Sequence, residues 1–88
     1  MPKYSLTIKN KVEKYILSLP VSDKNRIFDK LLLLSIGSFE LCDIKKMHGS
    51  NPLLYRLRVG DFRIIYEKHD DRLIIVVVKI GSRGDVYK

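Results

Sequence analysis

The chain contains one cysteine, no tryptophan and no long apolar run. Because Cys42 has no second cysteine to pair with, a disulfide within the chain is excluded, and its spacing from His48 and His69 is not that of a zinc site. The apolar residues 73–78 are too few to span a bilayer, and the amino-terminal end has no apolar run of signal-peptide length. We therefore expect a cytoplasmic protein that has no membrane association, no metal and no cofactor.

Flexible linkers, internal repeats and low-complexity segments are also missing. A chain of 88 residues has the length of one small domain, so we expect residues 1–88 to form a single domain. A domain of this size buries only about 60–65% of its unfolded surface. Its hydrophobic core is therefore modest.

Acidic side chains are few: 10 Asp and Glu stand against 17 Lys and Arg, which gives a formal net charge of +7. A surface of this kind raises the local concentration of polyanions. Five of the six arginines lie between positions 56 and 83, whereas lysines dominate the first half. Since a guanidinium group matches phosphate geometry and stacks on bases, this segregation favours RNA phosphates as the target. A surface that is merely basic remains the alternative.

The first half of the chain predicts a strand followed by a helical hairpin. Residues 4–8 alternate apolar and polar side chains, as a half-buried strand does. Asn10 is expected to cap a first helix with apolar positions spaced three and four apart, and Pro20 ends it. Ser22 is expected to cap a second helix that runs to about residue 35. Residues 36–52 hold glycine, asparagine and proline and are expected to be irregular.

The second half predicts three antiparallel strands, over residues 55–59, 62–68 and 72–80. Gly60 and Asp61 form the first hairpin connection, and Asp70 and Asp71 the second. The last strand is apolar on both faces, so we expect it to be central and covered on both sides. The fold class is therefore α+β: an N-terminal strand, a helical hairpin, and a three-stranded meander, in one sheet with the helices packed on one face.

Alternation along the first of these three strands separates two kinds of side chain. Tyr55, Leu57 and Val59 fall on one face, and Arg56 and Arg58 fall on the other. The arginines are thus expected to line a sheet surface. Ordinary solvent-facing positions are the simpler interpretation of the same pattern.

Three segments carry a family resemblance: Leu-Tyr-Arg-Leu-Arg at 54–58, Phe-Arg-Ile-Ile-Tyr at 62–66 and Gly-Ser-Arg-Gly-Asp-Val-Tyr at 81–87. With the preceding helical hairpin, the chain resembles the RelE-like toxins of the RelE/ParE toxin–antitoxin superfamily over essentially its whole length. The resemblance implies a metal-independent endoribonuclease that cleaves messenger RNA in the ribosomal A site. It also implies that the ribosome is a partner and that an acidic RelB-like antitoxin blocks the toxin.

The resemblance also implies a set of site residues, which in this sequence are Arg56, Arg58, Arg63, Arg83 and Tyr87. The family pattern has lysines where this chain has Arg56 and Arg58, and often a histidine where it has Ser82. Because arginine does not lose its proton in proteins, a lysine-like base is not available at those positions. Tyr87 is the expected general base, because nearby guanidinium groups favour its phenolate form, and His48 is the alternative.

Two other functions fit the same fold. A ParE-like toxin would bind DNA gyrase and cleave nothing. A non-catalytic module would use the arginines as phosphate contacts and Tyr87 as a stacking platform. The paired arginine and tyrosine near the end of the chain favour the nuclease, since a gyrase-binding protein has no need of them beside Arg56.

Overall fold

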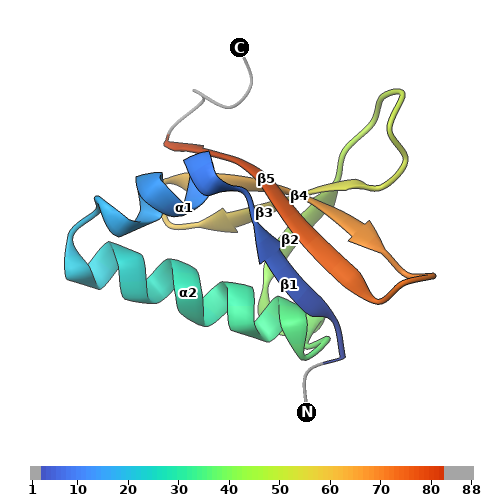
Figure 1. The fold of residues 1–88 in the computed structure, drawn as a ribbon, viewed down its shortest axis with the longest axis horizontal. Helices are drawn as coiled ribbons and strands as arrows, with labels where there is room; N and C mark the ends of the chain where they lie inside the picture. Colours follow the sequence, from blue (N-terminus) through green and yellow to red (C-terminus); the bar gives the residue numbers. More distant parts are fainter. Residues whose placement is uncertain (1–2, 83–88) are drawn as a thin grey trace.

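The computed structural model describes residues 3–82, in which two helices cover one face of a five-stranded sheet (Figure 1). The elements in chain order are β1 (Ser5–Ile8), α1 (Asn10–Leu17), α2 (Val21–Ser35), the short 3-10 helix η1 (Phe39–Leu41), β2 (Asp43–Lys46), β3 (Leu54–Val59), β4 (Phe62–His69) and β5 (Ile74–Ser82). Neither helix of this part of the chain is long and apolar enough to cross a membrane.

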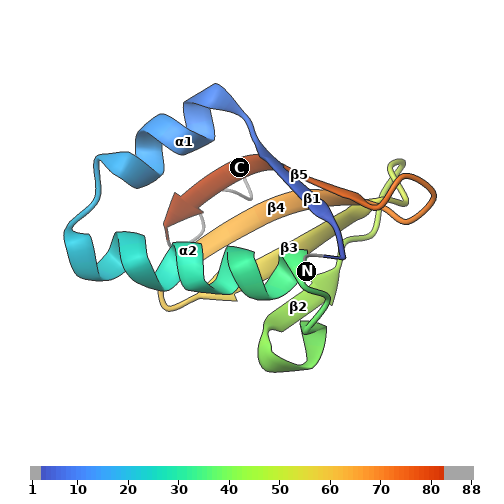
Figure 2. The same cartoon turned by 60° about the horizontal axis from the view of Figure 1, so that its bottom comes forward.

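The strands lie in the order β1-β5-β4-β3-β2. Strands β2 to β5 form antiparallel pairs, whereas β1 lies parallel to β5 at one edge (Figure 2). The helical hairpin carries the chain from β1, at one edge of the sheet, towards β2, at the opposite edge. The pairing of β4 with β5 shifts between Ile65 and Tyr66, which marks a bulge.

The core lies between the helices and the covered sheet face. Helix α1 contributes Val12 and Ile16 at a spacing of four, and α2 contributes a stripe that faces the same way. The side chains with no exposed surface are Ile16, Ile27, Leu31, Leu34, Leu57, Ile64, Ile75 and Val77. Burial alternates along β3 and the first part of β5, so the intervening residues there face away from the helices. In β4, Ile64, Ile65 and Tyr66 are all buried.

The α+β class, with both helices on one sheet face, is confirmed. The prediction that residues 36–52 are irregular was wrong in part, because they contain η1 and β2. Strand β2 pairs with β3 and contributes Ile44, the partner of Leu57, to the core. The other three residues of β2 are charged, as on many edge strands, and this left no apolar alternation to detect.

Both predicted helix caps were wrong. Asn10 is the first residue of α1 and Ser22 lies inside α2; the residues before the helices are Lys9 and Pro20, and neither makes a side-chain cap hydrogen bond. The carbonyl of Pro20 accepts the Lys24 amide at 3.0 Å. Proline fits here because its φ is fixed and its carbonyl begins the helical hydrogen bonds.

Strand β5 also differs from the prediction. It begins at Ile74, after a turn in which Leu73 has φ 55° and an exposed side chain. The central strand is β4, and the helices cover only one face of β5. Val76 and Val78 are consequently only partly buried. We call the sheet face that the helices leave uncovered the open face.

Candidate functional site

Basic side chains gather on the open face in two rows that cross the strands. The first row runs Asp43, Arg58, Arg63, Gly81 from β2 to β5, and the second runs Lys45, Arg56, Ile65, Lys79. Residues directly opposite each other in a sheet project to the same side. Because Leu57, Val59 and Ile64 are buried against the helices, the arginines beside them in sequence are placed on the open face.

Arg58 and Arg63 are direct cross-strand partners. Arg58 is exposed, and its Nε donates to the Gly60 carbonyl oxygen at 3.5 Å. Gly60 has φ 58°, a left-handed conformation that glycine adopts freely, and it forms the turn between β3 and β4. This turn therefore sets Arg58 and Arg63 at opposed positions of the open face, with Asp43 of β2 on the other side of Arg58.

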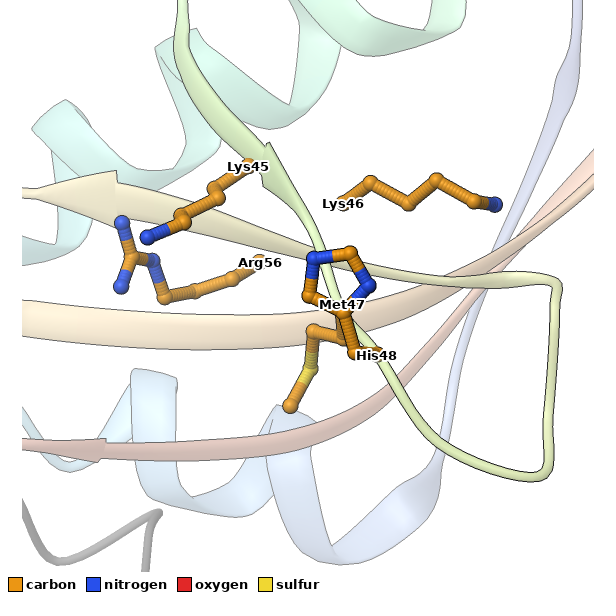
Figure 3. A pocket seen from close by; sticks show the side chains of 5 residues that line it. All are labelled: Lys45, Lys46, Met47, His48 and Arg56. Carbon is orange, nitrogen blue, oxygen red and sulfur yellow. The ribbon is translucent and has the colours of Figure 1, made fainter.

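The second row borders a pocket at the end of β2. Its walls are Lys45, Lys46, Met47, His48 and Arg56, and its volume is about 180 Å³ (Figure 3). Lys45 is exposed, whereas Arg56 is half-buried. The two side chains leave adjacent strands at paired positions and run side by side in Figure 3.

The loop after β2, which carries Met47 and His48, is attached to the strands at several points. The Met47 amide donates to the Leu54 carbonyl at 3.1 Å, and Asn51 Nδ2 donates to Glu67 Oε2 at 3.2 Å. His69 Nε2 lies 3.0 Å from Glu67 Oε1. These contacts fix the loop that forms one wall of the pocket.

Glu67 is held as a carboxylate. The hydrogen bond with His69, and to a lesser degree that with Asn51, lowers the pKa of Glu67 against the opposing effect of desolvation. His69 is the last residue of β4, and its side chain is only 27% exposed. His48 is exposed, as expected of a loop residue.

Two tyrosines can be set aside as proton acceptors at neutral pH. Tyr4 donates its hydroxyl to Asp70 Oδ1 at 2.7 Å, and this hydrogen bond, with burial, raises its pKa to about 12. Burial raises the pKa of Tyr66 well above its ordinary value. Both hydroxyls stay protonated near pH 7.

Arg56, Arg58 and Arg63 all lie on the open face; the alternation predicted this for Arg56 and Arg58. Arg83 and Tyr87 lie outside the described residues. Sequence reasoning missed Lys45 and Lys79, which complete the second row. Lys45 could be found only once β2 was recognised as a strand. Lys79 was missed because residues 72–80 are almost continuously apolar, so no alternation showed which face it lies on.

Within residues 3–82, no three His, Cys, Asp or Glu side chains gather as metal ligands would. In the two rows of the open face, cationic side chains outnumber the single carboxylate of Asp43, and strand pairing fixes their positions. Such a surface can bind a polyanion and can stabilise negative charge that develops on a bound phosphate.

Comparison with known proteins identifies the family. The sequence model of a family described as the ParE toxin of the type II toxin–antitoxin system parDE matches residues 4–87. RelE1 of Methanocaldococcus jannaschii, a candidate toxin, is 33% identical over 88 residues, which cover 98% of this chain and 97% of that protein.

Two solved structures show the same fold. A chain of the archaeal RelE–RelB complex from Pyrococcus horikoshii superposes with a TM-score of 0.82 at 31% identity, covering 94% of this chain and 98% of that one. The isolated RelE toxin of E. coli has a TM-score of 0.71 at 22% identity, with 96% and 90% covered. The latter likeness concerns the fold alone.

Proposed function

The chain belongs to the RelE/ParE toxins of type II toxin–antitoxin systems, and we propose that it is a metal-independent endoribonuclease that cleaves messenger RNA in the ribosomal A site. The observation that carries this proposal is the direct pairing of Arg58 with Arg63 on the open face, beside the half-buried Arg56. Two arginines at opposed positions of adjacent strands can donate several charge-assisted hydrogen bonds to one phosphate.

The proposed reaction is an attack by the 2′-oxygen of one nucleotide on the phosphorus that follows it. The 2′-hydroxyl loses its proton to a base, the bond from phosphorus to the 5′-oxygen breaks, and that oxygen takes up a proton. The products are a 2′,3′-cyclic phosphate and a free 5′-hydroxyl. Negative charge builds on the phosphate oxygens in the transition state, where fixed guanidinium donors stabilise it; one such donor is worth about 3–4 kcal/mol.

The proposed base is Tyr87. Arginine cannot accept the proton, and Tyr4 and Tyr66 hold theirs too tightly. His48 is the alternative, because it lies on the wall of the pocket that Arg56 also lines. Arg83 is proposed as a further phosphate ligand. The ribosome would supply much of the alignment of the 2′-oxygen, the phosphorus and the 5′-oxygen.

The proposed protein partner is an acidic RelB-like antitoxin. Support comes from the Pyrococcus horikoshii structure, which is a RelE–RelB complex, and from the net charge of +7. The proposed location is the cytoplasm, where ribosomes and messenger RNA are available.

Gyrase binding is the second candidate function, and the match to the ParE family description favours it. Primer extension on a translated messenger RNA, after induction of the toxin, separates the two. The nuclease produces breaks within the translated frame and none in a matched transcript without a start codon. A gyrase-directed toxin leaves both transcripts intact and inhibits supercoiling by purified gyrase instead.

A further inference from the structure

The pocket beside Arg56 is distinct from the Arg58–Arg63 pair and is lined by three residues that the sequence analysis did not select, Lys45, Lys46 and Met47. Lys45 on β2 is the direct cross-strand partner of Arg56 on β3. Met47 and His48 close the pocket from the loop that follows β2 (Figure 3). This site exists only because β2 is a strand.

Lys45 and Arg56 are two cations at opposed positions of adjacent strands, as Arg58 and Arg63 are. Like charges at opposed positions destabilise the sheet, and Arg56 is half-buried, with its Nε atom removed from solvent. Attraction between charges is stronger where water is partly excluded. An anion bound at Lys45 and Arg56 would interact favourably with both side chains.

The spacing of the two rows indicates which anion fits. Arg56 and Arg58 are two residues apart on one strand, which separates their rows by about 6.6 Å. This separation is comparable to that between successive phosphates along an extended single strand. If one phosphate lies at the Arg58–Arg63 pair, a neighbouring phosphate of the same strand reaches Lys45 and Arg56.

The walls of the pocket suit a nucleotide better than a protein segment. A volume of about 180 Å³ is too small for a helix, whereas an imidazole such as that of His48 can stack on an unstacked base. The hydrogen bond from Asn51 to Glu67 holds the loop in place before any ligand arrives. A preformed wall reduces the cost of ordering on binding.

We propose that Lys45, Arg56 and His48 form a second RNA subsite, in which the two cations bind the phosphate next to the scissile one and His48 contacts the adjoining base. The inference rests on the proposed function, since it takes the scissile phosphate to lie at Arg58 and Arg63. In this proposal, β2 and the loop that follows it position the RNA strand.

The test measures binding rather than cleavage. The isolated toxin is titrated by NMR with a short oligoribonucleotide that carries a 2′-deoxy sugar at the cleavage position, prepared with and without one additional terminal phosphate at either end. Titrations are repeated over a range of salt concentrations. The variants are Lys45→Gln, His48→Ala, and the matched control Lys14→Gln, an exposed lysine on α1.

The wild type is expected to bind one of the two phosphorylated oligonucleotides more tightly than the unphosphorylated one. For that oligonucleotide, the logarithm of the binding constant should fall more steeply with the logarithm of the salt concentration. The slope should be larger by about 0.7, the value for one single-strand phosphate contact. Lys45→Gln should abolish this increment, and Lys14→Gln should retain it. His48→Ala should retain the increment but weaken all forms equally. The subsite would be overturned if Lys45→Gln and Lys14→Gln showed the same salt dependence and the same preference for the phosphorylated oligonucleotide.

Two further results would also overturn it. Displacement of the oligonucleotide from Lys45 by inorganic phosphate at the same concentration as the oligonucleotide would indicate a site for free anions. A Lys45→Gln variant that loses antitoxin affinity but no oligonucleotide affinity would assign the pocket to the protein partner. Failure of the proposed nuclease function is a separate result, because it appears as uncut messenger RNA with the wild type while these binding increments persist.

Discussion

Arg58 and Arg63 face each other directly across β3 and β4, on the sheet face that no helix covers. The two-residue turn at Gly60 and Asp61 sets this register, so the pairing follows from the local sequence. Asp43 of β2 is the partner of Arg58 on its other side. The proposed function places a phosphate of the RNA at the Arg58–Arg63 pair, so substitution of Arg58 tests it.

Arg58→Gln is expected to separate function from stability. Loss of one charge from the pair should leave the free energy of unfolding within about 0.5 kcal/mol of the wild type, as for other exposed sites, while RNA cleavage falls by about 10²–10³-fold, the effect of losing one transition-state donor. Urea denaturation and single-turnover cleavage measure the two quantities. A variant that cleaves at the wild-type rate would show that Arg58 only contributes to solubility.

Two adjacent leucines on α2 test the core. Leu31 has no exposed surface, whereas 60% of Leu32 is exposed. Leu31→Ala should lower the free energy of unfolding by about 2–5 kcal/mol through lost burial and a residual cavity, and Leu32→Ala should change it by less than about 0.5 kcal/mol. Equal effects in thermal or urea melts would contradict the orientation of α2.

Glu67 is expected to make part of the stability depend on pH. Its pKa is lowered in the folded protein, so the unfolded chain binds the proton more readily and the carboxylate stabilises the fold at neutral pH. Glu67→Gln should cost about 1 kcal/mol at pH 7. This difference should persist above the unfolded value of about 4.3 and disappear as the pH falls through the lower folded value.

Urea melts of the wild type and Glu67→Gln at several pH values between 7 and 3 provide the measurement. The control is Glu40→Gln, at an exposed position of η1. A Glu67→Gln difference that is the same at both ends of this range would mean that the carboxylate charge is not what Asn51 and His69 stabilise.

Association with an acidic antitoxin should be fast at low salt. A chain with a net charge of +7 attracts an acidic partner over long range, and screening shortens that range to about 8 Å at physiological ionic strength. Stopped-flow association rates should therefore fall steeply between low and high salt, with a smaller change in dissociation. An association rate indifferent to salt would indicate an apolar interface remote from the open face.

Sequence alone predicted much of this fold for identifiable reasons. Alternation in β3 placed Leu57 and Val59 in the core and Arg58 on the opposite face, and the structure has this arrangement. The turn at Gly60 and Asp61 was also predicted, because few residues other than glycine favour the left-handed conformation that Gly60 adopts. The helices were found from the spacing of their apolar residues.

The features that escaped prediction depend on contacts distant in sequence. Strand β2 has one apolar residue, Ile44, and becomes a strand because β3 offers it an edge. The pocket at Lys45 and Arg56 could not be expected without that pairing. The helix starts were misplaced because Asn10 and Ser22 are good caps in isolation, yet Lys9 and Pro20 already supply the extended residue that each helix needs.

The most direct test of the account uses purified toxin and ribosomes stalled with a defined codon in the A site. We expect cleavage of the messenger RNA in that codon without added metal beyond what the ribosome requires, leaving a 2′,3′-cyclic phosphate and a 5′-hydroxyl. Arg58→Gln should lose most of this activity. Intact messenger RNA on programmed ribosomes, with inhibition of gyrase by the same preparation, would contradict the nuclease and support the gyrase-directed toxin.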